Sequence, residues 1–262
     1  MKSTQQKIEE IKNNGYSFNF ENTFELALDN YKKIAVYAGL TLLVFMTLFF
    51  GGLLGGLFSL YSFDDLMGNF RLISENPQAL SVNFIIGYYI SIVVFSCIYC
   101  PFTAGFFKMA DCGQKGEEFK VASMFEFYKM PYFYNIVLST LIITIFTAGF
   151  TYVFTNIGYS FVGSLLSMII SFFTFLTIPF IVFGKLNAIE SIRSSAIVVS
   201  KKPFILFGLL IVAGLFSILG VIGCGIGMFF TIPFMYSMTY AIYVLSIGID
   251  SEKQIEDLGI EN

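Results

Sequence analysis

The stretch Asn187-Ala-Ile-Glu-Ser-Ile-Arg-Ser-Ser195 opens a unit that extends to Ser246 and decides the fold of this chain. An amide side chain followed three residues later by a carboxylate, as in Asn187 and Glu190, is a signature of a helix N-terminus. Apolar residues then recur at helical spacing on one face, and polar residues occupy the other face; the apolar set is Ile189, Ile192, Ala196 and Val199. The pattern predicts a short amphipathic helix.

Two apolar spans complete this unit after Lys201-Lys202-Pro203. They cover about 204–221 and 226–249, and a glycine-rich turn over 220–227 joins them. Because apolar stretches of this length can cross a bilayer, the pair predicts a transmembrane hairpin.

The same plan occurs twice earlier in the chain. Helix-start signatures recur at Asn22-Thr-Phe-Glu25 and Ser123-Met-Phe-Glu126, and each is followed by basic residues and two apolar spans. The second span of every unit carries a Pro-Phe step, at Pro101, Pro179 and Pro233. We therefore predict an all-α integral membrane protein with six transmembrane helices in three repeats. Each repeat is an amphipathic cytoplasmic helix followed by a transmembrane hairpin with a proline-kinked second helix.

The repeats cover about 22–110, 120–186 and 187–249 of a single membrane domain over 22–249. Two spans per repeat give successive repeats the same orientation, which favours a pseudo-threefold bundle about an axis along the membrane normal. A polar segment, 1–21, with a short exposed helix precedes the domain, and an acidic tail, 250–262, follows it. We expect the connection over 60–82 to be a solvated loop with one half-buried turn. The alternative is a small docking cap, since Leu66, Phe70 and Ile73 are at helical spacing.

Composition supports a polytopic membrane protein. Of 262 residues, 56% are hydrophobic and 13% are charged, and the mean hydropathy is +0.77; ordinary globular domains are about half apolar. We expect no signal peptide, because the first apolar run begins only near Ile34. The chain has no histidine, which removes the commonest general base and metal ligand.

The distribution of positive charge predicts the orientation in the membrane. Of the 15 Lys and Arg residues, only Arg71 falls in a loop on the far side of the predicted hairpins. By the positive-inside rule both termini are cytoplasmic. The basic ends of the three amphipathic helices are then expected at the lipid headgroups; these are Lys32, Lys33, Lys129, Lys201 and Lys202. No basic block suggests nucleic acid as a partner.

Two features of the spans have both a structural and a functional interpretation. Three proline kinks at one level either splay the bundle into a cavity open to the cytoplasm or are a packing bend common to the repeats. Glycines in the first span provide small-x-x-x-small pairs that let another helix approach closely; these are Gly51, Gly52, Gly55 and Gly56.

Residues able to carry chemistry are few. The cores of the predicted spans contain no Asp, Glu, Lys, Arg or His, which argues against a proton-coupled carrier. Cys97 and Cys100 lie one helical turn apart, and packing is favoured over a redox or metal pair. We predict no catalytic residue, no metal and no cofactor, and we do not expect an enzyme.

The closing unit resembles a large bacterial group of poorly characterised membrane proteins. This group includes the membrane domain attached to some glycerophosphodiester phosphodiesterases. The resemblance covers about the last 75 residues and is mostly architectural before them; its motifs are 187–195, Lys202-Pro-Phe204, 220–227, Thr231-Ile-Pro-Phe234 and Tyr240-Ala-Ile-Tyr243. It implies a bacterial cytoplasmic (inner) membrane protein of about six helices, concerned with lipid or envelope upkeep, and it carries over no catalytic residue.

Two functional hypotheses follow. The first is a non-enzymatic membrane protein that acts as a lipid-associated scaffold or accessory subunit, with membrane lipids and a membrane protein as its expected partners. The alternative is a carrier or channel that passes a neutral or lipid-like solute through a cavity between the kinked helices. Catalysis within the membrane would need a nucleophile and a base that the sequence does not display.

Overall fold

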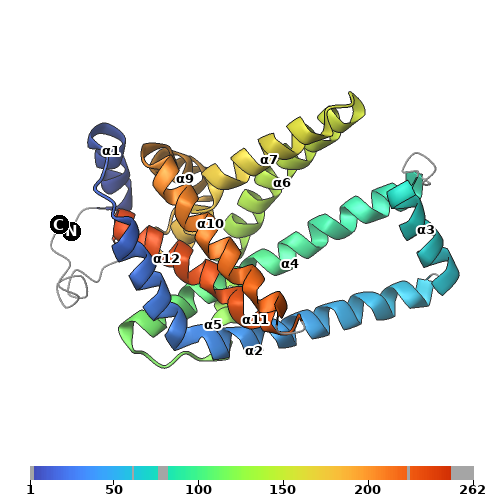
Figure 1. The fold of residues 1–262 in the computed structure, drawn as a ribbon, viewed down its shortest axis with the longest axis horizontal. Helices are drawn as coiled ribbons and strands as arrows, with labels where there is room; N and C mark the ends of the chain where they lie inside the picture. The colour runs from blue at the N-terminus through green and yellow to red at the C-terminus, as the bar shows by residue number, and fades with distance from the viewer. Residues whose placement is uncertain (1–2, 61, 76–81, 223–224, 249–262) are drawn as a thin grey trace.

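The computed structural model describes residues 3–60, 62–75, 82–222 and 225–248, and within these ranges the regular structure is entirely helical (Figure 1). The α-helices are α1 (Thr4–Asn14), α2 (Phe20–Leu60), α3 (Phe63–Glu75), α4 (Val82–Lys115), α5 (Val121–Met124), α6 (Tyr132–Asn156), α7 (Ser160–Thr174), α8 (Thr177–Val182), α9 (Ala188–Lys201), α10 (Pro203–Leu219), α11 (Gly227–Thr231) and α12 (Pro233–Ile247). Short 3-10 turns, η2 (Phe125–Tyr128) and η3 (Gly220–Ile222), complete the series. The predicted tail over 250–262 and part of the 220–227 turn lie outside the described residues.

Five segments of the described chain are long and apolar enough to cross a membrane: Phe20–Gly56, Val93–Lys115, Tyr132–Asn156, Ser160–Val182 and Gly227–Ile247. A sixth is counted if α9 and α10, which are bent by 102° at their junction, are taken together. The expected all-α, multi-pass membrane protein is therefore confirmed at this level.

Helix α12 lies at the centre of the molecule. It packs against α2, α4, α8 and α10, and most of its residues are buried. Helices α4, α8 and α12, which contain Pro101, Pro179 and Pro233, each contact the other two. Around them, α2, α3 and α4 form one projecting arm and α6 and α7 form another, while α1, α9 and α10 gather at the opposite end (Figure 1).

The first amphipathic helix is not separate from the first span. Helix α2 runs unbroken from Phe20 to Leu60, so the predicted boundary near Lys33 is wrong. No proline or glycine interrupts the chain there, whereas Pro203 separates α9 from α10. The predicted start is wrong as well, because the Asn19 Oδ1 accepts hydrogen bonds from the backbone N–H groups of Glu21 and Asn22, at 2.8 and 3.2 Å.

The second amphipathic helix is reduced to α5 and η2. The expected capping box at Ser123 is absent, since α5 begins after Lys120 and has no side-chain cap. Buried Met124 and Phe127 hold this short segment in place. A longer helix is blocked by Pro131, which disfavours helical geometry at the residue before it.

The third amphipathic helix, α9, begins as predicted, because the Asn187 side chain accepts a hydrogen bond from the Glu190 N–H at 2.9 Å. Of its predicted apolar set, Val199 is buried but Ile189, Ile192 and Ala196 are not. Ile189 is 67% exposed, and a serine-rich face is buried instead, consisting of Ala188, Ser191, Ser194, Ser195, Val198 and Val199. The outward isoleucine face suits contact with lipid.

The N-terminal helix is docked rather than exposed, which corrects the expectation for segment 1–21. Ser3 and Gln6 form a reciprocal capping box, and Ile8 and Ile11 are buried in the largest core cluster. The Tyr16 hydroxyl donates to the Val198 carbonyl at 3.3 Å. Burial raises the pKa of Tyr16 to about 12, so it remains a donor at neutral pH.

The connection after the first span also differs from the expected solvated loop. Its described part is mainly the 13-residue helix α3, and Leu66 is buried. The rest of the connection, 76–81, lies outside the described residues.

The break between α7 and α8 depends on Ser195. Its hydroxyl accepts from the Leu176 N–H at 3.1 Å and donates to the Phe173 carbonyl at 2.8 Å. We expect Ser195→Ala to lower the free energy of unfolding by about 1–3 kcal/mol, because two buried backbone groups lose their partner. Thermal unfolding in detergent measures this effect. Ser200→Ala is the matched control, since exposed Ser200 bonds only within α9; equal losses in both variants would contradict the prediction.

Candidate functional site

A buried polar network joins α2, α4 and α12 near the predicted cytoplasmic end of the molecule. Asn30 is fully buried; its Nδ2 donates to the Ala110 carbonyl at 2.7 Å, and its Oδ1 accepts from the Ser237 hydroxyl at 2.9 Å. Since every one of these groups comes from a different helix, the network fixes how α2, α4 and α12 lie against one another.

Asp111 is the charged centre of this region. Its side chain is 3% exposed and pairs with Lys115 at 2.9 Å and Lys108 at 3.6 Å. It also accepts a hydrogen bond from the Tyr240 hydroxyl of α12 at 3.2 Å. The sequence pattern does not indicate Asp111, because the apolar run of the second span ends near Lys108. Helix α4 nevertheless continues to Lys115. The spacing of Lys108, Asp111 and Lys115, typical of helical ion pairs, is the signal that identifies this continuation.

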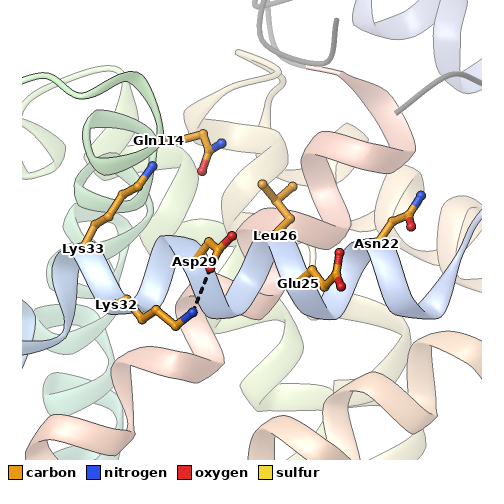
Figure 2. Close-up of a pocket in the computed structure, with 7 residues that line it drawn as sticks. All are labelled: Asn22, Glu25, Leu26, Asp29, Lys32, Lys33 and Gln114. Atoms are coloured by element: carbon orange, nitrogen blue, oxygen red, sulfur yellow. Dashed lines mark hydrogen bonds and ion pairs between the residues drawn. The ribbon is translucent and has the colours of Figure 1, made fainter. Parts of the chain in front are cut away.

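A polar pocket lies beside this network, over the first turns of α2 (Figure 2). It has a volume of about 410 Å³ and is lined by Asn22, Glu25, Leu26, Asp29, Lys32, Lys33 and Gln114; we call it the polar mouth. Gln114 comes from the end of α4 and stands across from Asp29 and Lys33 (Figure 2). Two of the five lysines expected at the headgroups, Lys32 and Lys33, are therefore placed together.

Two apolar cavities lie further along α2. The first, of about 340 Å³, is lined by Tyr37, Leu40, Thr41, Val44, Phe45, Leu48, Phe102, Val121 and Phe125. The second, of about 430 Å³, is lined by Leu48, Phe49, Gly52, Leu53, Ile90, Ser91, Val94 and Phe95. The two cavities share Leu48, and Lys33 of the polar mouth lies one helical turn before Tyr37. We call the two cavities together the α2 groove.

The floor of the α2 groove is aromatic. Phe45 of α2 stacks on Phe102 of α4 with ring centroids 3.8 Å apart, and Phe49 contacts Phe95 at 4.7 Å. These pairs hold α2 against α4 beneath the groove. Its outer side is open, because Leu40, Val44, Leu48, Ile90 and Val94 remain exposed.

The predicted packing glycines of α2 are not in close contact with another helix of the described chain. Gly51, Gly52, Gly55 and Gly56 are exposed, and a Cβ atom added at any of them would meet no described side chain within 4 Å. Gly52 instead lines the α2 groove. Close approaches occur elsewhere: an added Cβ would lie 2.7 Å from Ile34 Cγ2 at Gly113 and 2.8 Å from Met124 Cβ at Gly105. Packing of the α2 glycines against another chain stays a prediction.

The other residues singled out from the sequence lie away from the polar mouth. Pro101, Pro179 and Pro233 are buried in the packed centre, Lys129 follows η2, and Lys201 and Lys202 lie at the bend between α9 and α10. Helical structure is interrupted just before Pro179 and Pro233 but continues through Pro101. Cys97 and Cys100 are free thiols on α4.

Comparisons with protein-family models, curated proteins and solved structures find no match for this chain. Within the described residues no group of three or more His, Cys, Asp or Glu side chains is arranged to hold a metal ion. The fold defines the class, a multi-pass helical membrane protein. Its candidate site consists of the polar mouth and, one helical turn further along α2, the α2 groove.

We expect Asp111→Ala to lower the free energy of unfolding by about 1–3 kcal/mol, because Tyr240 loses its acceptor and two partly exposed lysines lose their counter-ion. Asp29→Ala is the matched control, since Asp29 also pairs with a lysine three residues away, but both side chains are about two-thirds exposed, at 64% and 63%. Its loss should be within about 0.5 kcal/mol. Chemical denaturation of the protein in detergent measures both values, and indistinguishable losses would refute the role of Asp111.

Proposed function

We propose that this protein is a non-enzymatic, lipid-associated scaffold of the bacterial cytoplasmic membrane, and that the α2 groove holds an acyl chain of a bilayer lipid. The observation that carries the proposal is that the polar mouth and the apolar groove lie one helical turn apart on α2. A phospholipid has the same sequence of polar head and apolar chain. The open outer side of the groove lets a lipid enter from the bilayer without crossing a polar barrier.

The dimensions of α2 support this placement. Its 41 residues extend about 60 Å, twice the hydrocarbon thickness of about 30 Å, so a large part of α2 lies beyond the bilayer core. With the basic segments on the cytoplasmic side, the Lys33 end of the groove lies at the inner headgroups. Helix α1 and the end of α12 lie at the same end of the protein, since Lys7 Nζ lies close to Gly248. This agrees with cytoplasmic placement of both termini.

We also propose that the three units are structural repeats arranged cyclically. At each proline step, the third residue before the proline has a backbone group that bonds a hydroxyl from an amphipathic segment of another unit. Ile98 O accepts from Tyr128 at 2.6 Å, and Phe230 O accepts from Tyr31 at 3.0 Å; Leu176 N, as described above, donates to Ser195.

The order of these contacts supports the repeat. Unit one is bonded by unit two, unit two by unit three, and unit three by unit one, which is the pattern that a pseudo-threefold axis produces. The mutual contacts of α4, α8 and α12 agree with it. The proposal includes a kink at the proline in the second span of each unit. It also includes a relationship to the bacterial group of membrane proteins that the closing unit resembles.

Packing around the prolines favours a scaffold over a carrier. The phenylalanines that follow them, Phe102, Phe180 and Phe234, are 1%, 0% and 0% exposed. A cavity between the kinked helices would need these large side chains to move. The polar side chains nearest the centre are likewise engaged in bonds between helices rather than directed at a free site.

Filling the α2 groove tests the proposed function. Gly52→Phe places a ring in the groove, and displacing or crowding a bound chain costs about 1–3 kcal/mol, which corresponds to about ten-fold weaker lipid retention. Native mass spectrometry of protein extracted in lipid discs measures the phospholipid bound per chain. Gly55→Phe is the control, because Gly55 is exposed on the same helix but does not line the groove. Equal retention in both variants would count against the groove.

A further inference from the structure

Charges in the polar mouth are ordered along α2. Starting from the apolar groove, the α2 backbone places Lys33 and Lys32 first, Asp29 about 6 Å further out and Glu25 about 6 Å beyond that. The Lys32 ammonium folds back onto Asp29, which leaves Lys33 as the positive group nearest the groove. The positive end of the mouth therefore adjoins the hydrocarbon region, and the negative end lies farther from it. A ligand that fits this order has an anionic group next to its apolar part and a cationic group outside the anionic one.

The internal ion pair of the mouth is easily exchanged. Lys32 and Asp29 are bonded at 2.9 Å, but their side chains are 63% and 64% exposed. Exposed pairs contribute little stability, because both partners are well hydrated. A ligand with both charges replaces this pair with two new ones, Lys32 or Lys33 to its anion and Asp29 to its cation, and leaves no charge unbalanced.

Gln114 adds a requirement for a hydrogen-bond donor. Its side-chain Oε1 has almost no exposed surface, and the described part of the chain offers it no hydrogen-bond partner; the residue lines the mouth opposite Asp29 (Figure 2). A ligand in the mouth reaches this oxygen once the flexible side chain turns toward it. A buried carbonyl without a partner is costly, and an incoming N–H group relieves that cost. A primary ammonium has three such groups, whereas a quaternary ammonium has none.

We propose that the polar mouth recognises the phosphoethanolamine headgroup of an aminophospholipid in the inner leaflet. The phosphate lies at Lys32 and Lys33, and the ammonium lies between Asp29 and the Gln114 carbonyl. This inference rests on the proposed function, because the acyl chain of the same lipid occupies the α2 groove. The position of that groove, one helical turn from the mouth, favours a lipid over soluble phosphoethanolamine, which has no apolar part to bury.

The test uses the full-length protein in discs that contain equal amounts of phosphatidylethanolamine, phosphatidylcholine and phosphatidylglycerol with identical acyl chains. Native mass spectrometry identifies the lipid that stays bound. We expect phosphatidylethanolamine to be enriched about five-fold over each of the other two, which corresponds to about 1 kcal/mol for one added hydrogen bond or ion pair. Equal binding of the three lipids would overturn the inference.

Two variants separate the parts of the headgroup site. Asp29→Asn should remove the preference over phosphatidylglycerol, because the cation loses its counter-charge. Gln114→Leu should reduce the preference over phosphatidylcholine, because the acceptor for the ammonium N–H is gone. Glu21→Gln is the matched control, since it removes one exposed negative charge from the same helix outside the mouth and should leave both ratios unchanged. Ratios that change equally in all three variants would contradict the site.

Comparing the groove variant with the headgroup-site variant separates this inference from the proposed function. If Gly52→Phe lowers total bound lipid while the wild type shows no headgroup preference, the groove is supported and the headgroup site is refuted. If the preference exists and Asp29→Asn abolishes it, but Gly52→Phe changes nothing, the headgroup site is supported and the groove is refuted. Soluble phosphoethanolamine at the same concentration should not displace the lipid, and displacement would assign the site to a soluble ligand.

Discussion

The structure depends on the need to satisfy polar groups buried between α2, α4 and α12. Asn30, Ser237 and the Ala110 carbonyl bond one another, and Tyr240 bonds Asp111. In surroundings of low dielectric constant an unpaired group of this kind costs far more than it does in water. Only one alignment of the three helices satisfies all of them, so this network fixes α12 at the centre and sets where α2 crosses α4.

The α2 groove follows from that alignment. The network holds the polar end of α2 against the end of α4, and the aromatic pairs Phe45–Phe102 and Phe49–Phe95 continue the contact further along. Outside this seam, α2 lines one cavity of the groove with Val121 and Phe125 and the other with α4. Polar and apolar portions of α2 form one unbroken helix, so the mouth and the groove lie one helical turn apart.

Proline steps and amphipathic segments act together in this fold. A proline lacks the backbone N–H that would bond the carbonyl four residues before it. Hydroxyls of Tyr31, Tyr128 and Ser195 bond backbone groups three residues before the prolines, next to that carbonyl. The amphipathic segments thus bond the proline-containing helices, a role separate from contact with the membrane surface.

The sequence by itself determined the class of the protein, because apolar span length and the Asn187 helix start depend only on local chemistry. It also singled out Lys32, Lys33 and Gly52 of the candidate site. Only the tertiary structure decided that α2 is continuous, that α1 docks through Ile8 and Ile11, and that α9 buries its serines. Likewise, Asn30, Asp111 and Gln114 belong to the site only because α2, α4 and α12 meet there. Periodicity identifies a face with one chemical character, but the partners of a buried hydroxyl, amide or carboxylate lie far away in the chain, and their bonds decide which face turns inward.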